Sequence, residues 1–188
     1  MLGQDFDTEF HDRPDEDCDR VCIVGNRIFS VKTLRINYTT YDVRREQDTI
    51  NPRTHPFVMV KTGETAKNAH PFWYAQVLGV YHASVFDMNA ESAARSPQRM
   101  EFLWVRWLGI DPGHRSGSRH ARLPKMGFVP HDDPDAFGFL DPAQVIRGCH
   151  LIPAFADGKT SSLMPYQGGT AARAPSELED WSYFYVNM

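Results

Sequence analysis

The chain has 188 residues, of which 41% are hydrophobic and 23% charged; it is long enough for one domain with a substantial core and too short for two full domains. No apolar run approaches the roughly 20 residues of a membrane span, and no signal peptide is recognisable, so we expect an intracellular protein. Three cysteines are an odd number for a disulfide framework, and we expect the thiols to be reduced.

The charge is unevenly distributed along the chain. Residues 1–20 hold eight acidic and two basic side chains, a net charge of −6, whereas the whole chain carries −4, so the remaining residues carry +2. The acidic segment lacks apolar periodicity, and we expect it to be a disordered arm. A mildly basic body is compatible with nucleic-acid contact but does not require it.

The first part of the body is predicted to consist of short strands joined by turns. Val21–Val24 and Arg27–Val31 flank the turn dipeptide Gly-Asn, which predicts a β-hairpin. The β-branched and aromatic residues of Ile36–Arg44 predict a strand, and residues 45–52 are expected to be a strand end that runs into a turn at Asn-Pro. Phe57–Lys61 is a further short strand, followed by a polar loop.

Two aromatic-rich runs form the centre of the predicted fold and contain three of the four Trp residues. FWYAQVLGVY (residues 72–81) and FLWVRWL (residues 102–108) have strand-forming composition, and both faces of each are largely apolar. Because both faces must be covered, we predict a small closed barrel with additional elements packed against it. Gly79 within the first run predicts a bulge or a bend.

The C-terminal half is predicted to contain long loops. Residues 111–125 form an exposed basic loop, and residues 126–139 form an irregular stretch. Asp141 as N-cap, Pro142 at the first helical position and Gly148 as a left-handed exit predict one or two helical turns.

The last segments complete the predicted domain. Cys149–Phe155 is a strand, and a capping box of Ser176 and Glu179 precedes a final aromatic strand. The expected organisation is an acidic arm (residues 1–20), one β domain (21–155), a flexible linker rich in Gly, Ser, Ala and Pro (156–175), and a C-terminal strand that packs back on the domain (176–188).

The order of these motifs resembles that of a bromo-adjacent homology (BAH) domain over about residues 36–155. In sequence order, the corresponding segments are FVMVK, HPFWYAQVLGVY, FLWVRWLG and FLDPAQVIRGCHLIPAF. The basic loop at residues 111–125 departs from the family, which usually has an Arg-Pro turn and acidic segments there. The resemblance implies a mainly β fold, a small BAH-like or tudor-like barrel with extra strands, short helices and long loops.

The block YTTYDVRREQDTINPRTHPFVMV, together with the two aromatic strands, is similar to a sequence in proteins encoded by fungal DNA transposons of the Plavaka and KDZ type. This similarity covers most of the chain. It implies a module that follows a transposase core and not the core itself, because the spaced Asp, Asp and Glu of a metal-dependent transposase are missing. The implied setting is DNA or chromatin in a nucleus.

The basic loop is the predicted nucleic-acid contact, because Arg and Lys side chains neutralise phosphates. Its candidate residues, with one from the neighbouring strand, are Arg115, Arg119, Arg122, Lys125 and Arg106. Solvated arginines on a surface loop are the alternative interpretation, and the prediction of DNA contact depends more on the transposon similarity than on charge.

Aromatic residues on the predicted strands allow two further interpretations. Six are candidates for a cage around a methylated lysine, such as one on a histone tail: Tyr38, Tyr41, Trp73, Tyr74, Trp104 and Trp107. On an exposed sheet the same rings would stack on the bases of single-stranded nucleic acid. Core packing is the more common role of aromatics at strand spacing.

Signals for a metal site or an active site are weak. Cys18 and Cys22 with Cys149 and His150 have the composition of a Cys₃His zinc site, but no second ligand pair occurs at motif spacing. The acids of HDDPD (residues 131–135) are expected to be solvated turn residues. Because no nucleophile motif, P-loop or G-x-G-x-x-G is present, we predict a non-catalytic protein with no cofactor and no metal.

The sequence therefore predicts a non-catalytic, transposon-derived module that binds chromatin or DNA in the nucleus. The alternative is a protein–protein scaffold of a transposase-like assembly, in which exposed aromatics form the partner surface. A metal-dependent nuclease is a third hypothesis, which requires carboxylates that converge on a metal. Neither a membrane nor a small-molecule substrate is expected as a partner.

Overall fold

The computed structural model describes residues 21–62, 70–87, 96–117, 120–163, 174 and 176–187. The predicted mainly β fold is confirmed, because most of these residues lie in strands, the largest antiparallel sheet is nearly closed into a barrel, and helices are few. Within these ranges no helix is long and apolar enough to cross a membrane. The predicted arm at residues 1–20 and residues 164–173 of the predicted linker lie outside the described residues.

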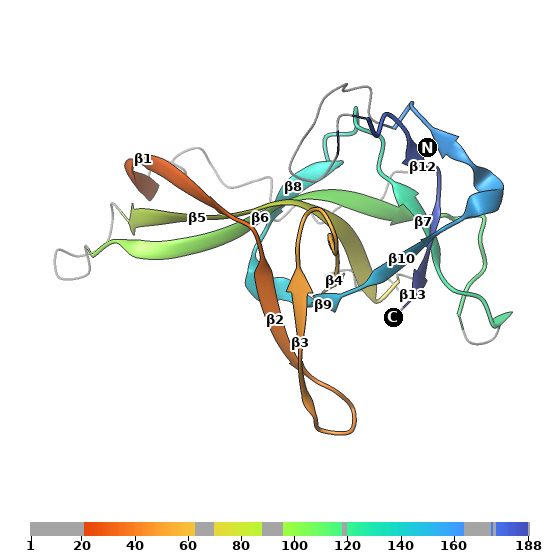
Figure 1. Cartoon of the computed structure of the whole chain (residues 1–188), viewed down its shortest axis with the longest axis horizontal. Coiled ribbons are helices and arrows are strands. Elements are labelled where there is room, and N and C mark those ends of the chain that lie inside the picture. The colour runs from red at the N-terminus through yellow and green to blue at the C-terminus, as the bar shows by residue number, and fades with distance from the viewer. Residues whose placement is uncertain are drawn as a thin grey trace.

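Two long strands form the centre of the sheet, as the two aromatic-rich runs predict: β5 (Phe72–Asp87) and β6 (Gln98–Ile110). Each pairs with two shorter strands along its other edge (Figure 1). These shorter strands are β4 (Phe57–Lys61) and β1 (Val21–Val31) on β5, and β7 (Lys125–Phe128) and β8 (Phe137–Leu140) on β6. The strand predicted at Phe57–Lys61 is confirmed, and it begins and ends at the predicted residues.

The barrel closes where β9 (Val145–Gly148) passes into β10 (His150–Pro153). The sheet runs in the order β10-β13-β7-β6-β5-β4-β9, in which β13 spans Phe184–Asn187. Its two end strands are therefore consecutive segments of the chain, with only Cys149 between them. The sheet must curl, because one short stretch of backbone lies at both of its ends (Figure 1).

Side-chain alternation along β4 and β5 produces a core on each face of the sheet. Val58 and Ala75 belong to the first core, whereas their neighbours Met59 and Tyr74 belong to the second. The second core also contains residues of β7, β10 and β13. Both faces of β4 and of the adjoining part of β5 are therefore covered, as expected for this part of the sheet.

A separate hairpin of β2 (Leu34–Thr39) and β3 (Arg45–Ile50) projects from the barrel (Figure 1), and we call it the ribbon. Ile36 and Ile50 are buried in the first core and anchor its root. A second small sheet pairs β11 (Lys159–Thr160) with β12 (Asp180–Trp181).

The bulge predicted at Gly79 is confirmed, because the register of β5 with β6 shifts between Val77 and Gly79. A Cβ atom at Gly79 would clash with the ring of Tyr81. Glycine is therefore required for this ring to lie over the strand, on the face that also carries Trp104, the residue opposite Gly79.

The prediction of a β-hairpin within residues 21–31 is wrong. Gly25 and Asn26 both have positive φ, 63° and 51°, as a turn dipeptide often does. The chain does not reverse there, because both flanks pair antiparallel with β5 and the register shifts between Ile23 and Ile28. The Gly-Asn pair is thus an irregularity within one strand.

The chain contains more strand than predicted. Residues 126–139, expected to be irregular, include most of β7 and β8, and residues 45–50 form β3. The cap predicted at Asp141 is confirmed, since its side chain accepts a hydrogen bond from the Ala143 backbone N–H at 2.8 Å. The helix itself is only three residues long, and the backbone then continues as β9 with no left-handed exit.

Candidate functional site

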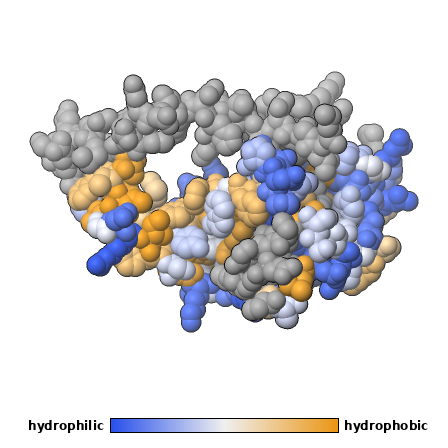
Figure 2. Space-filling view, turned by 90° about the horizontal axis from the view of Figure 1, so that it is seen from above, coloured by the Kyte–Doolittle hydropathy of each residue, from blue (hydrophilic) through white to orange (hydrophobic). Residues whose placement is uncertain are grey.

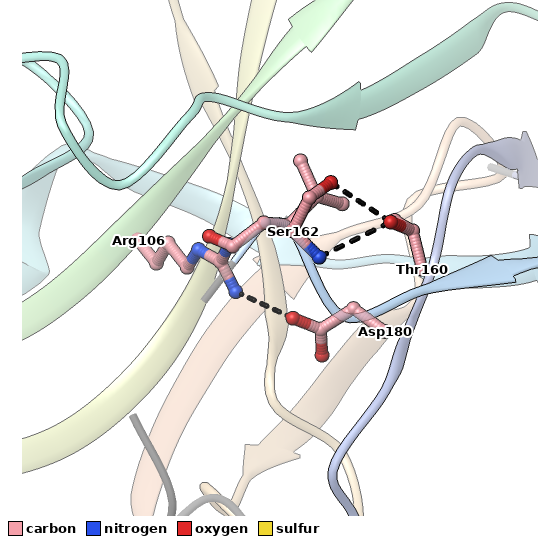
Figure 3. Close-up of polar contacts among 5 residues, drawn as sticks. Arg106, Thr160, Ser162 and Asp180 are labelled. Carbon is pink, nitrogen blue, oxygen red and sulfur yellow. Dashed lines mark hydrogen bonds and ion pairs between the residues drawn. The ribbon is translucent and has the colours of Figure 1, made fainter. Parts of the chain in front are cut away.

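Arg106, predicted as a phosphate contact, lies in the interior with only 1% of its surface exposed. Its guanidinium donates hydrogen bonds to Asp180 Oδ2 at 3.0 Å and to the Leu163 carbonyl at 2.7 Å (Figure 3). It also lies 4.0 Å from the ring centre of Phe128. The prediction for Arg106 is therefore wrong, because a guanidinium enclosed in this way cannot reach a phosphate.

The small β11–β12 sheet supplies Asp180, and the turn that follows β11 supplies the Leu163 carbonyl. Asp180 lies opposite Thr160 in this sheet. The Ser162 backbone N–H donates to Thr160 Oγ1 at 3.1 Å, which fixes the turn that leads to Leu163 (Figure 3). Arg106 thus joins the central strand β6 to a segment far away in the sequence.

Lys125, a second predicted contact, is held by two carboxylates. Its ammonium lies 3.0 Å from Asp157 Oδ1 and 3.5 Å from Asp111 Oδ2, and 4.4 Å from the ring centre of Tyr183. Desolvation alone would lower the pKa of Lys125, but the hydrogen bond and charge of Asp157, with Asp111, raise it. Lys125 therefore fastens the base of the loop at residues 111–125.

The rest of the predicted basic loop retains two exposed arginines, Arg115 and Arg122, whereas Arg119 lies outside the described residues. The ring of His114 packs against Tyr185 with centres 5.7 Å apart, which holds the loop against β13. Among its described residues the loop therefore presents two exposed arginines.

Three of the six predicted cage residues are part of the cores. Trp73 and Trp107 pack edge to face against each other, with ring centres 6.0 Å apart. Both rings also pack against the first core. Tyr74 lies in the second core with 1% exposure, and burial raises its pKa to about 12. Their role as core residues agrees with the alternative interpretation of these rings.

The other three predicted cage residues lie on different elements. Tyr38 belongs to the ribbon, and Tyr41 is fully exposed at its tip. Trp104 lies on β6, where its ring stacks on Phe137 with centres 5.9 Å apart. The six rings therefore do not form one cage.

The candidate metal ligands do not form a cluster. Among the described residues, no three His, Cys, Asp or Glu side chains are grouped so as to hold a metal ion. Cys18 lies outside these residues, and Cys22 is exposed on β1. Cys149 lies at the barrel closure, where burial raises the pKa of its thiol to about 12.

A mostly apolar pocket of about 260 Å³ lies beside the ends of β6 and β7. Two carboxylates line it, those of Asp111 and Asp133. Asp111 is paired with Lys125, and Asp133 Oδ1 accepts a hydrogen bond from the Asp135 backbone N–H at 2.9 Å. Both carboxylates therefore already have structural partners, which does not favour the nuclease hypothesis.

The outward face of the ribbon carries basic, amide and hydroxyl side chains. The β2–β3 register places Arg35 opposite Thr49, Asn37 opposite Gln47 and Thr39 opposite Arg45. These six side chains lie on one face because they alternate with the buried ones, and all six are exposed. Gln47 Nε2 donates to Asn37 Oδ1 at 2.7 Å, so the two amides are oriented before any ligand arrives.

The acidic side chains of these two strands lie on the inward face. The Tyr38 hydroxyl donates to Glu46 Oε2 at 3.0 Å, and this hydrogen bond is the main cause of the raised pKa of Tyr38. Asp48 Oδ2 accepts the backbone N–H of Gly148 at 2.9 Å, and the Arg147 guanidinium lies 4.8 Å from the Tyr38 ring centre. These contacts fix the ribbon to β9 and keep both carboxylates off the outward face.

The tip of the ribbon, residues 40–44, combines exposure with strain. Tyr41 is fully exposed and Val43 is 81% exposed. Val43 also has a φ of 65°, which a β-branched residue rarely adopts. A strained residue on an exposed, projecting turn is typical of a contact surface.

The ribbon stands in a basic part of the chain. Residues 21–62 contain seven Lys or Arg and three acidic residues, a net charge of +4, and all seven basic side chains are exposed. Four of these lie outside the ribbon and its tip: Arg27, Lys32, Arg53 and Lys61.

No family model matches the chain, and no curated protein and no solved structure matches it significantly. The BAH and transposon resemblances therefore stay predictions. The ribbon was missed at the level of sequence because β3 has few apolar residues. Its period-two pattern of Arg45, Gln47 and Thr49, which mirrors that of β2, is the signal that indicates a second strand.

Proposed function

We propose that the protein is a non-catalytic module that binds duplex DNA through the outward face of the ribbon and the exposed basic residues around it. The observation that carries this proposal is the segregation of charge on the ribbon. Cationic and amide side chains lie on its exposed face, whereas Glu46 and Asp48 are bonded on the other. An anionic partner therefore meets no carboxylate of the two strands on the outward face.

The shape of the ribbon supports a major-groove contact. The major groove of B-DNA is about 12 Å wide and admits a two-stranded β-ribbon. Arg side chains recognise guanine, and Asn or Gln side chains recognise adenine, by hydrogen bonds to base edges. Arg35, Asn37 and Gln47 present these groups side by side.

The basic residues outside the ribbon supply sequence-independent affinity. Lys32, Arg53 and Lys61 are exposed and belong to the same basic segment. Contacts of this kind release counterions from DNA, so affinity falls steeply as salt rises. In this proposal phosphate contacts set the position of the module and the ribbon reads the bases.

We further propose a nuclear, chromatin-associated setting and an origin in a mobile element. The support for both is the similarity of residues 38–60 and of the two central strands to proteins encoded by fungal DNA transposons.

Fluorescence polarisation with a labelled duplex of about 20 base pairs, at about 50 mM and about 200 mM salt, tests the proposal. Replacing Arg35 and Arg45 with Ala is expected to weaken binding at least about tenfold, because an Arg–guanine contact is worth about 1–3 kcal/mol. Neither side chain is buried, so the double variant should fold.

The matched control replaces Arg115 and Arg122 of the predicted basic loop with Ala, which removes the same charge. Less than about a threefold loss is expected. A larger loss for the loop pair than for the ribbon pair would place the interface on the loop. Equal losses would indicate binding by net charge alone, and absence of binding at low salt would refute the proposal.

A protein scaffold is the second candidate function. A different observation favours it, namely large hydrophobic side chains exposed on β1, β6 and β8, among them Ile28, Met100 and Phe139.

A further inference from the structure

One face of β1, β5, β6 and β8 carries a continuous set of large apolar side chains. Register and alternation place six of them on this face: Ile28, Tyr81, Met100, Phe102, Trp104 and Phe139. We call it the aromatic face. Phe139 is 66% exposed, Ile28 54% and Met100 45%. Figure 2 shows hydrophobic residues exposed at the end of the molecule to which β1, β5 and β6 extend in Figure 1.

The rings of this face contact one another in a row. Tyr81 stacks on Phe102 with ring centres 5.6 Å apart, Phe102 meets Phe139 edge to face at 5.6 Å, and Phe139 lies 4.9 Å from Trp104. The absence of a Cβ at Gly79 makes the contact between Tyr81 and Phe102 possible, because the ring of Tyr81 occupies the space where a Cβ would lie. The rings therefore form an ordered surface before any partner binds.

The chain around β8 is acidic. Residues 126–146 contain four Asp and no Lys or Arg, a net charge of −4. Three of these acids, Asp132, Asp133 and Asp135, precede β8, and Asp141 follows it directly. Carboxylates therefore stand at both ends of a short strand whose Phe139 is part of the aromatic face.

Among the described residues, no strand pairs with the outer edge of β8. In the described part of the chain β8 pairs with β6 only, along Leu103–Arg106. A strand at the edge of a sheet presents N–H and C=O groups that an extended segment of another chain can pair with.

We infer that the aromatic face and the edge of β8 bind an extended, lysine- or arginine-rich segment of a partner protein. The segment adds a strand to β8. The aliphatic stems of its basic side chains cover Phe139 and Trp104, and their charged ends reach the carboxylates at either end of β8. Large exposed apolar surface of this kind marks interaction sites, and here the flanking charge selects the partner.

The charge argues against the other occupants. Single-stranded nucleic acid also stacks on aromatic rows, but its phosphates would be repelled by four carboxylates. A second copy of the chain would meet the same negative charge if the two aromatic faces met each other. A basic peptide segment satisfies both the rings and the carboxylates.

Isothermal titration with two synthetic peptides of about eight residues tests this inference. One alternates Lys and Val, and the other alternates Glu and Val. The Lys-Val peptide is expected to bind and the Glu-Val peptide is not. Phe139→Ser is expected to weaken binding of the Lys-Val peptide at least about tenfold.

The matched control for Phe139→Ser is Phe155→Ser, since Phe155 is 70% exposed but lies beside Trp181, away from this face. It is expected to leave binding unchanged. Because both positions are exposed, both variants should fold, and circular dichroism with thermal unfolding verifies this.

The charge requirement is tested with Asp132→Asn, Asp133→Asn and Asp141→Asn combined. Asn keeps the side-chain oxygen that accepts the turn hydrogen bond at Asp133 and the cap hydrogen bond at Asp141. We expect about a tenfold loss of affinity for the Lys-Val peptide. The corresponding control is Glu177→Gln with Glu179→Gln, two exposed acids elsewhere, with no loss expected.

Three results would overturn the inference: equal binding of both peptides, unchanged affinity of Phe139→Ser, or preferential binding of a single-stranded oligonucleotide that Phe139→Ser abolishes. Sedimentation of the chain alone tests the remaining alternative, in which a second copy of the chain binds the aromatic face. A dimer that Phe139→Ser dissolves would show that the face binds a second copy instead. None of these outcomes depends on the ribbon or on its binding to duplex DNA.

Discussion

Residues 21–62 and residues 126–146 differ in charge and in the chemistry of their exposed surface. The first segment carries +4, and its ribbon presents arginines and amides to solvent, whereas the second carries −4 and contributes the exposed Phe139 to the aromatic face. Both are attached to the first core, the ribbon through Ile36 and Ile50 and β8 through Leu140. One core therefore supports two surfaces that fit partners of opposite charge, although the net charge of the chain is only −4.

The largest effect is expected in the interior that both regions share. Asp180→Asn removes the charged partner of the buried Arg106 and should lower the free energy of unfolding by about 3–5 kcal/mol. Urea unfolding followed by Trp fluorescence measures it. The control is Glu101→Gln, which breaks the exposed Arg99–Glu101 pair on the same strand and should cost less than about 1 kcal/mol. Similar values for the two variants would contradict the structural role of Arg106.

The attachment of the two regions to the first core is tested by truncating one anchor of each. Ile50→Ala and Leu140→Ala each remove a side chain that is at most 4% exposed, and each should cost about 2–4 kcal/mol. Hydrogen exchange should show faster exchange of β3 in the first variant and of β8 in the second. Loss of protection throughout the barrel in either variant would show that the region does not open separately from the rest of the fold.

We expect Cys149, at the barrel closure between β9 and β10, to make the folded protein less stable at high pH. The pKa of Cys149 is raised to about 12 in the folded protein from an ordinary value near 9, so the unfolded chain loses its proton first. Stability is therefore complete below about pH 9 and falls as the pH rises toward 12, by about 2 kcal/mol between pH 9 and 11. In Cys149→Ala this fall should be at least about 1 kcal/mol smaller. An identical pH dependence would mean that the thiol is accessible in the folded state.

The smallest effect is expected at the tip of the ribbon. Val43→Gly relieves a left-handed conformation and should raise the free energy of unfolding by about 1 kcal/mol. If the strained tip contributes to DNA binding, the more stable variant should also bind duplex DNA more weakly. A variant that is less stable than the wild type would show that the strain is compensated by contacts of the valine side chain.

The elements that the sequence predicts well are those in which local pattern and tertiary environment agree. Phe57–Lys61 and the adjoining parts of the two central strands are apolar on both faces and lie between the two cores, and Gly79 predicts the bulge in β5. β3 was missed because it has few apolar residues and because its half-buried Asp48 has a distant partner: Asp48 accepts a hydrogen bond from the backbone N–H of Gly148, one hundred residues away. No local rule reveals such a partner.

Some of the site residues, too, could not be predicted from the sequence, because their environment depends on residues far away in the chain. Arg106 resembles a surface residue in the sequence, and the partners of its buried guanidinium include Asp180 and the Leu163 carbonyl, both far along the chain. The aromatic face could be predicted only in part. Trp104 is among the predicted cage residues, but Phe139 lies in a stretch that the sequence predicts to be irregular. The turn signals of Pro130 and Pro134 obscured the short strand that follows.

The central claim is that the two oppositely charged regions bind different partners independently. It is tested most directly by titrating the Arg35→Ala, Arg45→Ala double variant and the Phe139→Ser variant with both the DNA duplex and the Lys-Val peptide. We expect the first variant to lose DNA binding and keep peptide binding, and the second to lose peptide binding and keep DNA binding. Loss of both ligands in either variant, or of neither ligand in both, would contradict it.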